Sequence, residues 1–205
     1  MKHKLKIDPA KTFKNEVDEI LDVVIKLIWI YTIFRGLFEK KEEDREKDYY
    51  KARAAHPQFF LTIHDSLLCG FCDTTTLLFK EKDNETSIYS LIKHVKELKP
   101  SLAKKLRKQI QAKNSLLKKI KSIRHGVHTH QNKTKTPQEA FIEANLSLNM
   151  LKEVADFTQS IINELAEEAA ESQNEKLKNL QLSNDILQSL TNDTDQVMRT
   201  LLKAA

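Results

Sequence analysis

Three histidines and an arginine lie close together in residues 123–130, which read Ile-Arg-His-Gly-Val-His-Thr-His. They are Arg124, His125, His128 and His130, in a chain that has 7 histidines in all. An imidazole, whose ordinary pKa is about 6.5, moves protons at neutral pH. A guanidinium holds a phosphate through two hydrogen bonds and stabilises charge that develops on it. Together these groups suffice for metal-free RNA cleavage, in which the ribose 2′-hydroxyl attacks the adjacent phosphorus.

Two other interpretations of this cluster are open. His128 and His130 could contribute to a zinc site, but no carboxylate or cysteine lies near them in the sequence to complete it. Cations at a helix C-terminus complement the helix dipole, which explains one basic group more easily than four. We therefore expect no metal and no cofactor.

The segment that leads into the cluster is strongly basic. Residues 93–135 hold 14 Lys and Arg and one acid, Glu97, whereas the whole chain has a formal net charge of +5. With so few acids in the segment, Glu–Lys pairs along the helix cannot offset the repulsion. The segment is either a solvated helix face or, as we favour, the contact for an anionic partner such as RNA. Lys118, Lys119 and Lys121 are the candidate RNA-binding residues.

A second motif with chemical potential is Cys69-Gly70-Phe71-Cys72. Thioredoxin-type redox chemistry requires such a pair where a strand meets a helix. Here the pattern places it in the middle of a helix, and no second cysteine pair exists to complete a zinc site. The alternative, which we favour, is two small buried apolar residues.

The elements that position these residues are predicted to be helices. Only 3 Gly and 4 Pro occur among 205 residues, too few for the turns of a sheet protein. Apolar residues at steps of three and four predict one-sided helices. Their expected ranges are 13–38, 58–80, 87–99, 100–127, 137–169 and, more weakly, 175–202. In the second of these, Phe59, Phe60, Ile63, Leu67 and Leu77 are expected to point inward.

Such one-sided helices predict an all-α, up-and-down bundle of about five to seven helices. We expect the bundle over residues 1–172 and a C-terminal helix over 173–205, which packs on the bundle or binds a partner. The most apolar stretch, 27–34, has eight residues and is far short of the roughly 20 that span a bilayer. With no secretion signal evident and two cysteines, we expect a cytoplasmic protein without a membrane partner.

The cluster resembles the signature of the HEPN superfamily (higher eukaryotes and prokaryotes nucleotide-binding). That signature is an Arg, then a polar residue, with four to six residues between the Arg and a His. Arg124, His125 and His130 match it. The wider chain is similar to the abortive-infection U branch, in residues 29–38 (Trp-Ile-Tyr-Thr-Ile-Phe-Arg-Gly-Leu-Phe) and 57–60 (Pro-Gln-Phe-Phe).

The resemblance implies a metal-independent endoribonuclease of a bacterial defence or toxin–antitoxin system, with an antitoxin protein as a possible partner. It implies that Arg124 stabilises the transition state, that His130 acts as general acid or base, and that His125 orients the pair or binds phosphate. It also implies a homodimer in which the motifs of two subunits meet. Some relatives carry a Tyr two places after the motif His; here Asn132 stands there, and we expect no regulation by adenylylation. The competing function is a non-catalytic helical module that binds nucleic acid or a partner protein.

Helix geometry constrains the site. Six positions place His130 about 240° from Arg124 around an ideal helix, so the two face apart. They can share a site if the helix breaks, for which Gly126 is suited, or if they come from two subunits. His128 shares a helical face with Arg124 and is the rival general base.

Overall fold

The computed structural model describes residues 9–38, 50–81, 86–128 and 136–171, together with Gln196 and Thr200. These described residues contain helices and no strand, which confirms the predicted all-α class. The helices are α1 (Pro9–Phe38), α3 (Pro57–Leu78), α4 (Ile88–Leu98), α5 (Pro100–Ala112), α6 (Asn114–His128), α7 (Pro137–Glu143) and α8 (Leu148–Glu171).

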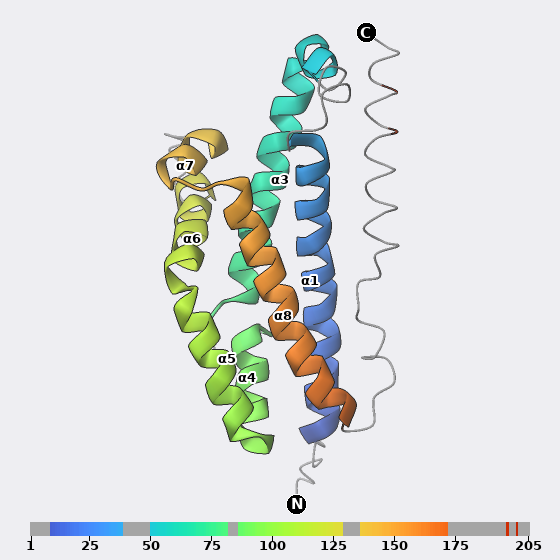
Figure 1. Ribbon diagram of the computed structural model, residues 1–205, viewed down its shortest axis with the longest axis vertical. Coiled ribbons are helices and arrows are strands. Elements are labelled where there is room, and N and C mark those ends of the chain that lie inside the picture. Colours follow the sequence, from blue (N-terminus) through green and yellow to red (C-terminus); the bar gives the residue numbers. More distant parts are fainter. Residues whose placement is uncertain are drawn as a thin grey trace, which may run out of the picture.

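The helices form an up-and-down bundle (Figure 1). In that view α1 rises, α3 and then α4 descend, α5 and then α6 rise, and α8 descends. Helix α1 packs against α3 and α8, and α3 packs against α6 on its other side. Helix α3 therefore connects the α1 side of the bundle to the basic helix α6.

The core is one continuous cluster to which α1, α3, α4, α5, α6 and α8 all contribute. Leu27, Leu68, Phe71, Ile120 and Ile123 are almost fully buried. Burying each such side chain stabilises the fold by about 1.5–3 kcal/mol. These contacts fix the register of α6 against α3, and with it the position of every side chain on the basic helix.

Two residues predicted to point inward do not. Phe59 and Leu77 are 41% and 45% exposed, whereas their neighbours Phe60 and Leu78 are buried. Consecutive helical residues point about 100° apart, so only one of each pair faces the core. The prediction for Phe60 is confirmed, and Ile63 and Leu67 are partly buried.

The helix expected over 100–127 is two helices. Lys113 separates α5 from α6, and its N–H bonds to the Ile110 carbonyl at 3.0 Å, three residues back. The apolar spacing lapses at the same place, because no large apolar residue lies between Ile110 and Leu116. The gap in the apolar pattern therefore indicated the break, but the predicted helix over 100–127 was extended across it.

The helix expected over 137–169 is interrupted as well. It begins as predicted, with Thr136 and Glu139 forming a reciprocal capping box. It then stops because Asn145 adopts a left-handed conformation, with φ of 48°. The Asn145 and Leu146 N–H groups bond back to the carbonyls of Ile142 (2.9 Å) and Phe141 (3.3 Å). This is a Schellman helix end, which redirects the chain into α8.

Other predicted ends agree with the structure. Ser87 caps α4 through a capping box with Ser90, and Pro57 lies in the first turn of α3. The helix expected over 175–202 lies outside the described residues, apart from Gln196 and Thr200, which are helical.

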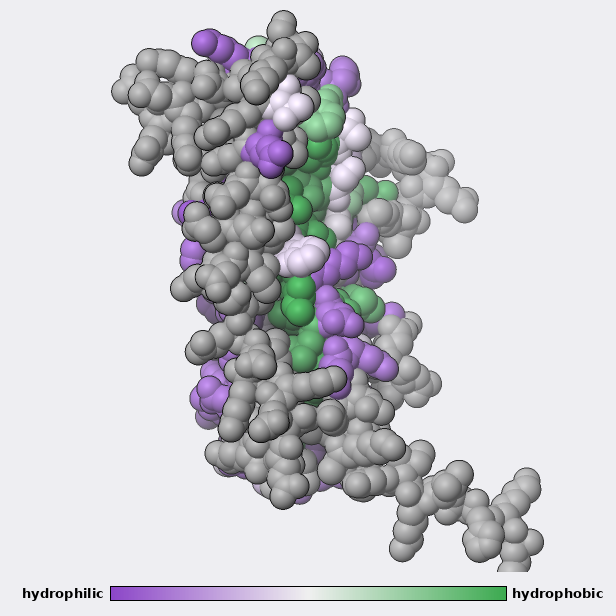
Figure 2. Space-filling view, turned by 90° about the vertical axis from the view of Figure 1, so that its right-hand side faces the viewer, coloured by the Kyte–Doolittle hydropathy of each residue, from purple (hydrophilic) through white to green (hydrophobic). Residues whose placement is uncertain are grey.

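The side of the molecule on the right of Figure 1, where α1 lies, carries a run of hydrophobic surface (Figure 2). In α1, Trp29 is 45% exposed and Ile33 is partly exposed. The basic helix α6 lies at the opposite side of the bundle (Figure 1). The apolar and basic surfaces of the described chain are therefore separate. Across the described helices, we find none with the length and apolar character that a membrane crossing requires.

Asn145 offers a test of the interruption between α7 and α8. Replacing Asn145 with Gly removes the Cβ that opposes positive φ, so Asn145→Gly should match or exceed the original stability. Asn145→Ala should be about 1 kcal/mol less stable than Asn145→Gly in urea unfolding. Asn149→Ala, at an exposed position within α8, is the matched control and should change the unfolding free energy little. Equal stability of the Ala and Gly variants at 145 would contradict the assigned conformation.

Candidate functional site

Helix α6 carries the first part of the predicted motif, which includes Arg124 and His125. It runs from Asn114 through Gly126 to His128, and no described glycine has a positive φ. The helix therefore does not break at Gly126, which was one of the two ways considered for bringing Arg124 and His130 into one site. His130 and the side chain of His128 lie outside what the structure describes, so their roles stay predictions.

Arg124 is held by a carboxylate that the sequence analysis did not identify. Its Nε donates to Asp73 Oδ1 of α3 at 3.0 Å, across a separation of 51 residues. The two side chains are 40% and 43% exposed, so the ion pair adds only about 0–1 kcal/mol to stability. Its main effect is orientation, because a guanidinium held through Nε presents its two terminal nitrogens along another edge. Nothing in the sequence pattern pointed to Asp73, since only the packing of α3 on α6 brings it near.

One face of α6 is exposed from Asn114 to His125. Asn114, Lys118, Lys121 and His125 are all exposed and follow one another at steps of three and four. These four residues, the α6 stripe, therefore share a helical face. Lys119 is half-buried and points away from them. Of the three predicted RNA contacts, Lys118 and Lys121 thus lie in line with His125.

The basic segment finds acids on other helices. Lys105 of α5 pairs with Glu164 of α8 at 2.7 Å, and Lys113 pairs with Glu153 of α8 at 2.6 Å. Burial alone would raise the pKa of Glu164, but hydrogen bonds from Lys105 and Gln109 outweigh it and hold the pKa below its usual range. The sequence analysis counted acids along the chain and missed this compensation between helices.

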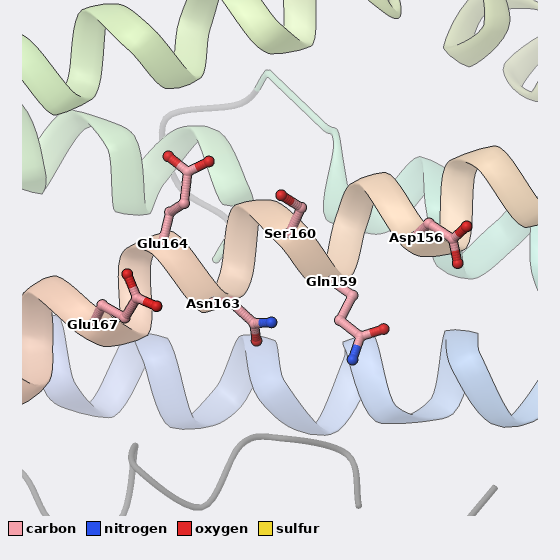
Figure 3. A pocket seen from close by; sticks show the side chains of 6 residues that line it. All are labelled: Asp156, Gln159, Ser160, Asn163, Glu164 and Glu167. Carbon is pink, nitrogen blue, oxygen red and sulfur yellow. The ribbon is translucent and has the colours of Figure 1, made fainter. Parts of the chain in front are cut away.

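Helix α8 presents an acidic groove of about 420 Å³. Its lining residues all project from this one helix, and Glu164 points away from α1 whereas Asn163 and Gln159 point toward it (Figure 3). Two of its three acids are in ion pairs, Glu164 with Lys105 and Asp156 with Lys152, so most of the negative charge of this groove is compensated.

The two cysteines lie in the middle of α3, as predicted, and are free thiols. Burial, followed by the charges of Asp73 and Asp65, raises the pKa of Cys69. Burial, followed by Cys69 and Asp73, raises the pKa of Cys72 to about 12. Redox-active cysteines have a lowered pKa, because the thiolate is the reactive form. The geometry thus favours the apolar interpretation over redox chemistry, although only Cys72 is buried and Cys69 is partly exposed. Among the described residues, no three His, Cys, Asp or Glu are placed to hold a metal ion.

The raised pKa values predict slow thiol chemistry. In the folded protein both thiols should stay protonated well above pH 8, so alkylation by iodoacetamide should be slower than in urea and should accelerate as the pH rises. Cys69 should react before Cys72, which is 1% exposed. Mass spectrometry of a time course measures both rates. Rapid labelling of Cys72 at pH 7 would contradict this assignment.

An all-α bundle with an Arg-His pair near the end of a basic helix is the arrangement of a HEPN-type domain. A family model described as AbiU2, from the HEPN superfamily, matches residues 10–188. The chain therefore belongs to the AbiU2 family, an abortive-infection branch of HEPN domains, which confirms the assignment made from the sequence. The match spans every described helix from α3 to α8 and nearly all of α1. Comparison with curated proteins and with solved structures gives no match.

Proposed function

We propose that the protein is a metal-independent endoribonuclease that acts as the toxic effector of its abortive-infection system. The observation that carries this proposal is the position of Arg124. Its guanidinium is oriented by Asp73 and lies beside the α6 stripe, whose cations attract a phosphate backbone. Membership of the AbiU2 family supports the same function.

Each residue of the motif has a role in this proposal. The terminal nitrogens of Arg124 bind the scissile phosphate and stabilise the charge that develops on it. His130 transfers the proton as general acid or base, and His125 binds or orients the phosphate. Lys118 and Lys121, with Lys119 nearby, attract the RNA.

The active form in this proposal is a homodimer with the motifs paired at its two-fold axis. On an ideal helix Arg124 and His130 face apart, and α6 is unbroken as far as His128. If His130 comes from a second subunit, it can lie beside Arg124 without a break in the helix. Gly126 leaves room for a second subunit there, because a Cβ at this position would meet no described residue within 4 Å. An antitoxin that masks the α6 stripe is part of the same proposal.

One observation favours the competing function, a non-catalytic module that binds nucleic acid or protein. The Asp73 carboxylate already compensates the charge of Arg124, as in many structural ion pairs. If Arg124 only tethers α6 to α3, it contributes nothing to cleavage. Mutations that separate binding from cleavage decide between the two functions.

Substitution of the histidine separates them. His130→Ala removes the proton-transfer group but little phosphate attraction, so RNA binding should persist while cleavage falls by roughly 10²–10⁴-fold. Arg124→Ala should reduce both, because a phosphate contact is lost. Cleavage of labelled RNA should proceed in EDTA and leave a 2′,3′-cyclic phosphate.

The control for this experiment is His128→Ala, which should be mild if the five-residue spacing is operative. Loss of activity in His128→Ala with full activity in His130→Ala would assign the base to His128. If the unmodified protein cleaves no RNA with or without added metal ions, the non-catalytic module is the better account.

Asp73 gives a second test, because its negative charge weakens RNA binding whereas its hydrogen bond orients Arg124 for cleavage. Asp73→Ala removes a negative charge beside the phosphate site, so RNA binding should tighten or stay unchanged. The guanidinium loses its anchor, and misplacement should lower kcat by roughly 10–100-fold. Asp73→Asn keeps an acceptor for Nε and should restore much of kcat. A purely structural role predicts instead that kcat falls only with the folded fraction, which circular dichroism measures.

A further inference from the structure

A polar cavity lies at the other end of the α6 stripe. It encloses about 460 Å³ between α4, α5 and the start of α6. Helix α4 contributes Tyr89 and Lys93, one turn apart, and α5 contributes Arg107 and Gln111, again one turn apart. Asn114 completes the wall from α6. An ammonium, a guanidinium and two amides thus converge from three helices on one space, which suits a ligand rich in acceptor oxygens.

One acid lines the same cavity, and it has a partner there. Tyr89 donates a hydrogen bond from its hydroxyl to the Glu81 carboxylate. Burial first, then this bond, raises the pKa of Tyr89 to about 12, while the charge of Arg107 acts in the opposite direction. The hydroxyl therefore remains protonated at neutral pH. The tyrosine is fixed at the wall of the cavity with its ring half-buried.

The α6 stripe connects this cavity to the motif. Asn114 both lines the cavity and begins the stripe, which continues through Lys118 and Lys121 to His125. At 1.5 Å per residue, Asn114 is about 15 Å from Arg124 along the helix axis. A single strand of a few nucleotides is long enough to contact both. The phosphates between them would pass along the two exposed lysines.

We infer that this cavity is a nucleotide subsite for single-stranded RNA, a few nucleotides away from the phosphate held by Arg124. Lys93 and Arg107 bind a backbone phosphate, and the ring of Tyr89 stacks on a base. Glu81 accepts a hydrogen bond from a base amino group or a ribose hydroxyl. The choice of RNA as the ligand rests on the proposed function. The subsite makes that function more specific, because it assigns single-stranded RNA as the substrate. The same chemistry fits a free nucleotide, which the experiment must distinguish.

The experiment compares two neighbouring cations of α5. Arg107→Ala removes a residue of the cavity, whereas Lys108→Ala removes the same charge at the next, exposed position outside it. Both are made in the His130→Ala protein so that RNA stays intact, and binding is followed by fluorescence anisotropy. The probes are a labelled RNA 10-mer, a trimer and the mononucleotide AMP, with AMP measured by calorimetry.

A nucleotide subsite predicts a length-dependent effect. Arg107→Ala should weaken binding of the 10-mer about tenfold and leave the trimer within about twofold, because the trimer can occupy the Arg124 end alone. Lys108→Ala should change either affinity less than about threefold. Tyr89→Leu should weaken binding of the 10-mer by a further factor of about five or more. Equal effects of Arg107→Ala and Lys108→Ala would overturn the subsite, since general attraction would then suffice.

The remaining outcomes separate the subsite from the ribonuclease. If AMP binds and depends on Arg107 while the 10-mer does not, the cavity is a nucleotide site and the RNA assignment is overturned. If the unmodified protein does not cleave RNA but the Arg107 effect on the 10-mer holds, the subsite stands and the ribonuclease fails. If the unmodified protein cleaves RNA, but Arg107→Ala and Lys108→Ala change RNA binding equally, only the subsite is overturned. If no RNA binds, both are overturned.

Discussion

Three cations of the basic segment, Lys105, Lys113 and Arg124, each meet a carboxylate on a neighbouring helix. These ion pairs divide the segment into one side that is compensated within the bundle and another that remains a cationic surface. Taken individually, partly exposed pairs add little to stability. Collectively they decide where a polyanion is attracted, because charge already matched by a carboxylate contributes less to the field outside. Lys118 and Lys121, exposed on α6, are the cations that this arrangement leaves in line with the motif.

Helix α3 makes this arrangement possible. It packs on α1 through a close approach at Gly70, where a Cβ would lie 3.3 Å from Ile30 Cδ1. Its other side packs on α6 and presents Asp73 to Arg124. Cys72 of α3 belongs to the same buried core, whereas Cys69 is only partly buried. In the proposed function, a guanidinium positioned in this way needs little reorganisation to bind a phosphate, which is the general advantage of a preorganised site.

Some local features were predictable because they depend on neighbours in the sequence. The starts of α3, α4 and α7 lie within one residue of the predicted starts, because each depends on a short local pattern: Pro57 in the first turn of α3, Ser87 at the cap of α4 and Thr136 with Glu139 at α7. Helix interruptions were harder. Asn145 carries no unique signal in the sequence, since asparagine is also common in other turn conformations, and the break at Lys113 was visible only as a gap in the apolar spacing. Phe59 is followed by Phe60 and Leu77 by Leu78, and only one residue of each apolar pair can face the core. Packing between helices decides which of the two is buried.

The sequence by itself determined that the chain is helical and that one segment is basic, and its resemblance to HEPN domains singled out Arg124 and His125. The first two properties follow from composition and periodicity, which act over one or two helical turns. The tertiary structure alone decided which carboxylate holds Arg124 and which lysines face outward. It also brought Tyr89, Lys93 and Arg107 around one cavity. Such juxtapositions join residues far apart in the chain, and they depend on how buried side chains set the register between helices.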